Sequence, residues 1–118
     1  MRTSYAPLEN VSQIRIFYHK GGIHCKGMVL EYNNGGQRAV GECRIMVDHC
    51  ETFTRPSSIA FVNSGASLYQ VKIRVDGPLD DGDEWMHYTM AGTLVFWFSG
   101  MKAHMSVEGG FKISHDSQ

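Results

Sequence analysis

The chain has 118 residues, of which 42% are hydrophobic and 19% are charged, as in a folded globular domain rather than a disordered segment. Eleven basic and twelve acidic side chains give a formal net charge of −1, without a run of like charge. This balance argues against nucleic acid and against an anionic membrane surface as partners. No stretch of the sequence approaches the roughly 18 apolar residues that a membrane-spanning helix requires.

The length predicts one domain over residues 1–118. Residues 1–10 are polar and lack the apolar centre of a secretory signal. We expect them, together with residues 114–118, to be frayed tails. Three cysteines are too few and too irregularly spaced for a disulfide framework, so we expect free thiols and a cytoplasmic location.

Apolar and polar residues alternate in short runs that are separated by Gly-containing turns, which is typical of antiparallel strands. In chain order, the predicted strands cover residues 11–18, 23–32, 37–44, 57–63, 67–76, 85–90, 92–98 and 101–107, with a short last strand over 111–113. Residues 45–56 are less regular, and residues 77–84 (GPLDDGDE) form a loop by composition. No segment keeps a 3.6-residue period. The sequence therefore predicts an all-β fold, either an antiparallel β-prism or a β-sandwich or barrel-like domain.

The first predicted hairpin resembles a known family. Ile14-Arg15-Ile16 precede Ile23, and residues 27–35 (GMVLEYNNG) place their apolar residues, Tyr and Gly as jacalin-related β-prism lectin domains do. The resemblance covers residues 12–41. It implies a β-prism fold and carbohydrate binding.

The sugar-binding loop of that family has the form G-x-x-x-D near the C-terminus. Residues 77–81 (GPLDD) have this spacing, whereas the last predicted hairpin, at residues 98–101 (FSGM), lacks an Asp. The segment 92–100 (GTLVFWFSG) also looks similar to small fungal proteins of unknown function.

The acidic loop at residues 80–84 (DDGDE) is the first candidate for a ligand site. Clustered carboxylates can accept hydrogen bonds from sugar hydroxyls, act as general acid and base, or bind Ca²⁺, although Asp and Gly also favour solvated turns. The spacing does not match an EF-hand loop. Trp85 would offer an aromatic face to a sugar ring beside this loop. We therefore predict a carbohydrate site in the loop 80–85, with Asp80, Asp81, Asp83, Trp85, His87 and Tyr88 as ligand-binding residues.

The alternative is a cofactor-free isomerase or cyclase of small-molecule metabolism. Its apolar cavity would be lined from the strand 85–90, by Trp85, Met86, Tyr88 and Met90. Asp81 and His87 would then move protons, since a carboxylate can orient a neighbouring imidazole. A closed apolar cavity would favour this enzyme, and a shallow polar loop site would favour the lectin.

No cofactor or metal is predicted. The histidines and cysteines lack C-x-x-C and H-x-x-x-H spacings, and adjacent His-Cys pairs on a strand point to opposite faces. Trp97 lies between Phe96 and Phe98 in the most apolar segment, so we expect it in the core. If this segment forms a sheet edge, it would pair with a second copy and give a homodimer. The expected ligand is a sugar or another small molecule.

Overall fold

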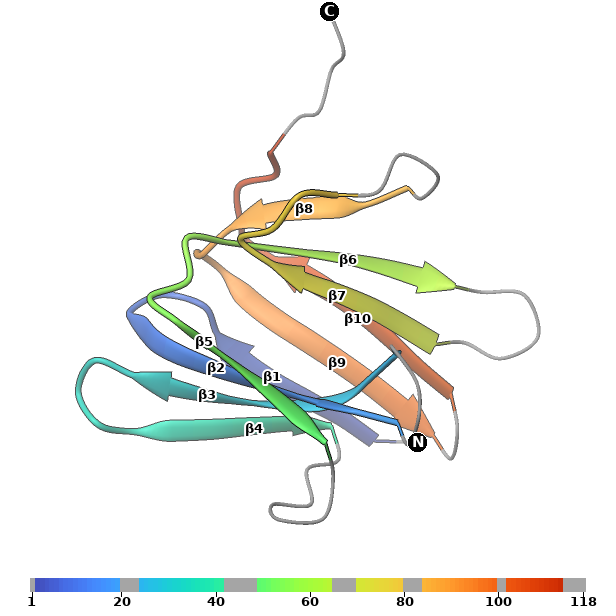
Figure 1. Ribbon diagram of the computed structural model, residues 1–118, viewed down its shortest axis with the longest axis horizontal. Coiled ribbons are helices and arrows are strands. Elements are labelled where there is room, and N and C mark those ends of the chain that lie inside the picture. Colours follow the sequence, from blue (N-terminus) through green and yellow to red (C-terminus); the bar gives the residue numbers. More distant parts are fainter. Residues whose placement is uncertain are drawn as a thin grey trace, which may run out of the picture.

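The structure, a computed structural model, describes residues 2–19, 24–41, 49–64, 70–79, 84–99 and 102–113. The regular elements of these residues are all strands: β1 (Arg2–Pro7), β2 (Val11–Tyr18), β3 (His24–Tyr32), β4 (Gln37–Gly41), β5 (Cys50–Thr54), β6 (Ser58–Ser64), β7 (Gln70–Val75), β8 (Met86–Thr89), β9 (Thr93–Ser99) and β10 (Lys102–Glu108). Every strand pairing is antiparallel (Figure 1). The predicted all-β fold class is confirmed.

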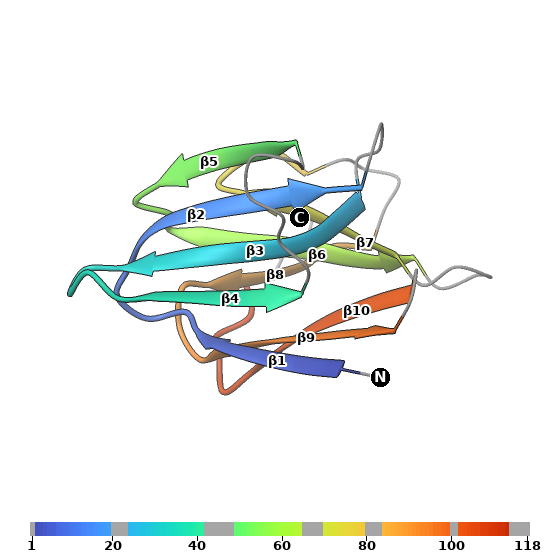
Figure 2. The same cartoon turned by 90° about the horizontal axis from the view of Figure 1, so that it is seen from below.

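The strands form two sheets. The small sheet has the order β1-β9-β10, and the large sheet has the order β5-β2-β3-β7-β6-β8, with β4 beside β3. Figure 2 shows the small sheet as a layer beneath the strands β2, β3 and β4. The arrangement is sandwich-like, and the described strands do not close into a barrel.

Strand β3 divides the large sheet into two wings. Its later residues pair with β4, whereas His24 and Cys25 pair with β7 along the same edge. We call β5-β2-β3-β4 the first wing and β7-β6-β8 the second wing. Their joint is the row in which Tyr18 of β2 lies opposite Cys25, and Cys25 lies opposite Val71 of β7. From this joint the two wings diverge (Figure 1), and residues of β5 and β7 line a hollow between them.

One hydrophobic core lies between the wings and the small sheet, and its buried side chains come from both sheets. The predicted alternation holds in two strands, because Ile14 and Ile16 of β2 and Val71, Ile73 and Val75 of β7 are buried on the inner side. Phe17 is also buried, although the alternation assigns it to the other face. A register shift between Phe17 and Tyr18 accompanies this departure.

The N-terminal segment is a strand, so the prediction that residues 1–10 are frayed is wrong for residues 2–10. Strand β1 pairs with β9 over its whole length, and Ala6 and Leu8 are fully buried. Residues 114–118 lie outside the described part of the chain. The predicted strand over 111–113 is reduced to an isolated bridge between Lys112 and Tyr88.

Strand β9 occupies the centre of the small sheet, so the GTLVFWF segment offers no free edge to a second copy. Phe96 is fully buried, whereas Trp97 is partly exposed and lies in one row with Thr3 and His104. The prediction that Trp97 packs in the core is therefore wrong. Side chains of β9 do alternate between the two faces of the sheet, but Trp97 is on the face that points away from the core.

Within the described residues, Cys25 and Cys50 form no disulfide; Cys25 is buried and Cys50 is exposed. Cys43 lies outside the described residues.

Asn63 joins the second wing to the small sheet. Its side-chain amide donates to the carbonyl of Met105 in β10, and its oxygen accepts from the Met105 N–H, both at 2.9 Å. The side chain thus completes hydrogen bonds that no neighbouring strand supplies at this point. We expect Asn63→Ala to lower the free energy of unfolding by about 1–3 kcal/mol, because it leaves two backbone groups unsatisfied. Urea denaturation would measure the loss, and Asn63→Asp should be only partly tolerated because a carboxylate cannot donate to the Met105 carbonyl.

Asp76 holds the end of β7 to the start of β6. Its carboxylate accepts hydrogen bonds from the backbone N–H groups of Ser57 and Ser58 and from the Ser57 hydroxyl, at 2.7–3.0 Å. Burial by itself would raise the pKa of Asp76, but these hydrogen bonds outweigh it and lower the pKa below the ordinary value of 3.8. The ionised form is thus preferred in the folded state.

We expect Asp76→Asn to cost about 1 kcal/mol at neutral pH, where the charged acceptor is present, since water competes for an exposed group. A carboxylate whose pKa is lowered by folding stabilises the protein above its unfolded pKa and loses this effect as pH falls through the folded value. The difference between the two proteins should therefore shrink as the pH falls below the ordinary carboxyl pKa of 3.8. Urea titrations at pH 7 and in acid would reveal a constant difference if the charge has no role.

Candidate functional site

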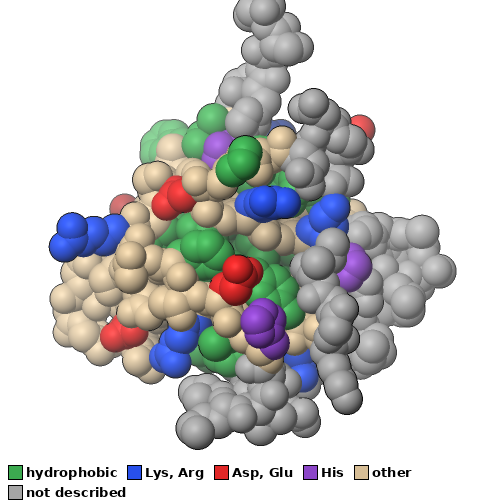
Figure 3. Space-filling model, in the orientation of Figure 1, with side chains coloured by type: hydrophobic (Ala, Val, Ile, Leu, Met, Phe, Trp, Pro, Cys, Tyr) green, Lys and Arg blue, Asp and Glu red, His purple; other side chains and the backbone are tan. Residues whose placement is uncertain are grey.

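A cleft of about 480 Å³ lies between the two wings of the large sheet. It is lined by Tyr18, His49, Glu51, Phe53, Ile73, Arg74, Val75 and Gly77. Figure 3 shows hydrophobic side chains on this face, beside acidic, basic and histidine side chains. The divergence of β5 from β7 thus produces a hollow that combines apolar and charged groups.

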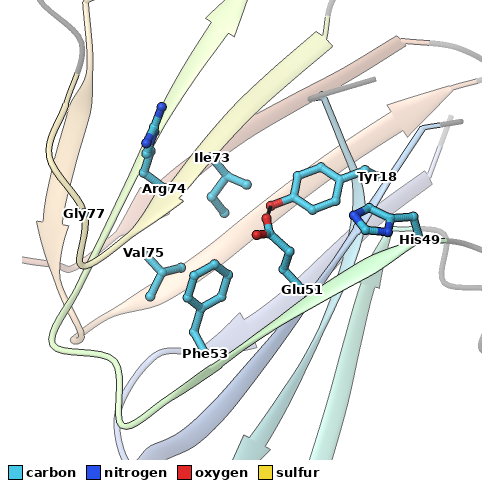
Figure 4. A pocket seen from close by; sticks show the side chains of 8 residues that line it. All are labelled: Tyr18, His49, Glu51, Phe53, Ile73, Arg74, Val75 and Gly77. Carbon is cyan, nitrogen blue, oxygen red and sulfur yellow. Dashed lines mark hydrogen bonds between the residues drawn. The ribbon is translucent and has the colours of Figure 1, made fainter. Parts of the chain in front are cut away.

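The central polar contact of the cleft joins two strands of the first wing. Glu51 lies opposite Ile16 in the pairing of β5 with β2, so the alternation directs it to the inner side of the wing. Tyr18 ends β2 at the joint between the wings, and its hydroxyl donates to Oε1 of Glu51 at 2.6 Å (Figure 4). The other carboxylate oxygen receives no hydrogen bond from a described residue, and it remains an acceptor for a ligand.

Tyr18 is a permanent donor in this pair. Burial raises the pKa of its hydroxyl far above the ordinary value for tyrosine, and the hydrogen bond to Glu51 and the charge of Glu51 raise it further. The nearby positive charge of Arg74 acts in the opposite direction and does not reverse the shift. Tyr18 therefore keeps its proton at neutral pH and fixes the orientation of the Glu51 carboxylate.

Apolar side chains form the walls on both sides of this pair. Phe53 follows Glu51 by two residues and projects from the same face of β5, opposite Ile14. Ile73 and Val75 face it from β7, as Figure 4 shows. His49 lies beside Tyr18 at the start of β5, with the two ring centroids 5.9 Å apart. A ligand in the cleft would thus meet an aromatic ring, a carboxylate and an imidazole within one hollow.

This arrangement suits a ligand that has an apolar face and several hydroxyl groups. Carboxylate oxygens accept hydrogen bonds from hydroxyls, and aromatic faces supply contact area of fixed geometry. The same groups could move a proton, because Glu51 can accept one while Tyr18 stabilises the carboxylate.

Of the predicted site residues, the structure describes Trp85, His87 and Tyr88, and none of these three lines the cleft. Asp80, Asp81 and Asp83 lie outside the described residues. Trp85 is half-buried, and Nζ of Lys72 lies 5.8 Å from its ring centroid, within cation–π range. The indole N–H of Trp85 is buried and has no hydrogen-bond partner among the described residues.

Strand β8 brings the other candidates to two opposite faces. Tyr88 stacks on Phe61, with ring centroids 5.9 Å apart, and it packs against the core together with Met86 and Met90. His87 lies between Met86 and Tyr88, so the alternation directs it to the other face of β8. The residues proposed to line an apolar cavity thus divide: Met86, Tyr88 and Met90 contribute to the core, while Trp85 lies beside Lys72.

The site residues missed by sequence reasoning are Tyr18, His49, Glu51 and Phe53. Tyr18 and Glu51 are 33 positions apart, and they meet because β5 pairs with β2. One local feature of the sequence could have indicated the site: Glu51 and Phe53 are two residues apart, so on a strand they share a face. This feature has meaning only if residues 50–54 form a strand, and the irregular pattern of residues 45–56 does not predict one.

No protein-family model, curated protein or solved structure matches this chain. Within the described ranges, no group of three or more His, Cys, Asp or Glu side chains could hold a metal ion. A search of the same residues for a helix that could span a membrane finds none.

Proposed function

We propose that this domain binds a small polyhydroxylated ligand, of the carbohydrate class, in the cleft between β5 and β7. The observation that carries the proposal is the Glu51 carboxylate, which Tyr18 orients at 2.6 Å beside the ring of Phe53. Sugars present hydroxyl groups around a ring that also has an apolar face. The fixed Glu51 carboxylate can accept hydrogen bonds from the hydroxyl groups, and the ring of Phe53 can pack against the apolar face.

Three further points support the carbohydrate class. The cleft is open and mixed in polarity, unlike the closed apolar cavity that a cyclase would use to shape a flexible substrate. The resemblance of residues 12–41 to jacalin-related lectins points to the same ligand class. The near-neutral net charge of −1 also suits an uncharged ligand better than a polyanion.

A glycan array with the purified protein tests the proposal, with Glu51→Gln as the critical variant. The substitution keeps the size of the side chain but removes the charge, and the exposed position should tolerate it. Loss of one charged hydrogen bond to the ligand is expected to weaken binding by at least about tenfold. Tyr18→Phe should give a smaller loss, because the carboxylate would stay but lose its orienting donor.

Glu108→Gln is the matched control, since Glu108 is an exposed carboxylate at the end of β10 in the small sheet. It should leave every array signal unchanged. Binding that survives Glu51→Gln in a folded protein would move the sugar site away from the cleft. A blank array with folded protein would oppose carbohydrate as the ligand class.

The second candidate is the cofactor-free isomerase, and the Tyr18–Glu51 pair favours it as well. In this reaction, Glu51 would remove a proton from carbon and return it at another position, with the apolar walls of Phe53 and Val75 holding the substrate. Sugars that bind on the array can be incubated with the protein in D₂O and recovered for NMR. Deuterium at a carbon position that depends on Glu51 would identify catalysis, and unchanged sugars would identify a binding module.

A further inference from the structure

A second hollow, of about 510 Å³, lies at the end of the first wing, at the turns rather than between the wings. Its walls are the turn from β1 to β2 and the hairpin from β3 to β4, which forms the left tip of the molecule in Figure 1. None of its lining residues also lines the cleft. The two hollows are therefore separate places on the surface.

Backbone hydrogen bonds hold the two walls of this hollow together. The N–H of Asn33 donates to the carbonyl of Asn10 at 2.8 Å, which connects the hairpin with the preceding turn. The hydroxyl of Tyr32 donates to the carbonyl of Pro7 at 2.6 Å, and this contact fixes its ring between the walls. These contacts within the chain fix the two turns relative to each other, which lowers the cost of ordering them around a ligand.

Unpaired planar amides line the hollow. The side chains of Asn10, Asn33 and Gln37 make no hydrogen bond within the described part of the chain. Each of them offers both a donor and an acceptor, and a sugar hydroxyl is also both. Arg38 adds a guanidinium group, of which Nη1 donates to the carbonyl of Tyr5 at 3.2 Å.

The charges of the lining residues indicate which class of ligand this hollow could bind. Glu9 and Arg38 both line the hollow, and their opposite charges balance. A phosphate or carboxylate in this hollow would therefore be attracted by Arg38 and repelled by Glu9, whereas an uncharged hydroxyl could hydrogen-bond to either. The lining thus favours a neutral polyhydroxylated ligand over an anion.

We infer that this hollow is a second carbohydrate-binding site, so that one domain carries two. The ligand class is shared with the proposed function of the cleft, on which this inference partly rests. The support for the site comes from residues of this hollow, Asn33, Gln37 and Arg38, and is independent of the cleft. Two sites on one chain would allow the domain to bridge repeated sugars on a polymer, with a gain in avidity that neither site provides alone.

NMR titration of the ¹⁵N-labelled protein tests the inference, with methyl glycosides of mannose, galactose, glucose, fucose and N-acetylglucosamine as probes. The side-chain amide signals of Asn33 and Gln37 report directly on the hollow, and the backbone signals of Glu51 and Phe53 report on the cleft. At least one glycoside should shift both sets of signals. Asn33→Ala and Gln37→Ala should each raise the Kd at the hollow by about tenfold and leave the Kd at the cleft unchanged.

These two positions are suitable for substitution because both are exposed, and neither has the positive φ of Asn10, at 62°. Movement of the cleft signals alone would overturn the second site and leave the proposed function standing. Movement of the hollow signals alone would support the second site and overturn the cleft as a sugar site. A titration in which neither set moves with any glycoside would overturn both, and a response of the hollow to inorganic phosphate alone would replace sugar with an anion.

Discussion

Phe96→Ala is expected to lower the free energy of unfolding by about 3–5 kcal/mol, the usual loss when a fully buried phenylalanine is truncated. Phe96 lies at the centre of the small sheet and is completely buried. Its ring reaches across to the first wing, where its Cε1 lies 2.9 Å from the position that a Cβ of Gly41 would occupy. Truncation would therefore leave a cavity between the two sheets.

The neighbouring substitution, Trp97→Ala, is the matched control. Trp97 is larger than Phe96 but lies on the outward face, so we expect its loss to cost about 1 kcal/mol or less. Urea denaturation of the two variants gives the comparison. An equal or greater loss for Trp97→Ala would mean that β9 has the opposite phase, with Trp97 in the core, as the apolar surroundings of Trp97 in the sequence suggest.

The fold could be predicted from the sequence where strands are long and have one apolar face. Strands β2 and β7 show this pattern, and their inner residues Ile16 and Ile73 are buried. Strands β1 and β5 are not predicted, because their pairing with neighbouring strands defines them and their apolar pattern does not. Strand β1 (RTSYAP) buries one small side chain, Ala6, and β5 (CETFT) is an edge strand that half-buries one apolar residue, Phe53.

The site was harder to predict for a related reason. The acidic loop at residues 80–84 is predicted as the site because its carboxylates are neighbours in the sequence. The cleft is made by residues that become neighbours only when β5 pairs with β2 and β7 diverges from β3. Tyr18 and Glu51 are unremarkable in their own segments, and their pairing depends on a register that single-sequence patterns do not contain.

Gly92→Ala is expected to lower the free energy of unfolding by more than about 3 kcal/mol, a loss typical of substitutions that disrupt a specific backbone arrangement. Gly92 lies directly before β9 with a φ of 80°, a conformation that residues with a Cβ avoid. A Cβ at this position would lie 2.5 Å from the carbonyl oxygen of Glu108 and 2.6 Å from the nitrogen of Gly110. Both atoms belong to the backbone, so the clash cannot be relieved by rotating a side chain.

Gly109→Ala separates the two causes of this loss. Gly109 has a similar φ of 71°, but no atom lies within 4 Å of the position of its Cβ. Strain without a clash should cost about 1–2 kcal/mol. The excess loss in Gly92→Ala then measures the close approach of β10 to the turn before β9, where the Gly92 carbonyl also accepts a hydrogen bond from Leu8 at 2.9 Å. Equal losses in thermal or urea denaturation would show that conformation alone selects glycine at position 92, and that the end of β10 can move aside.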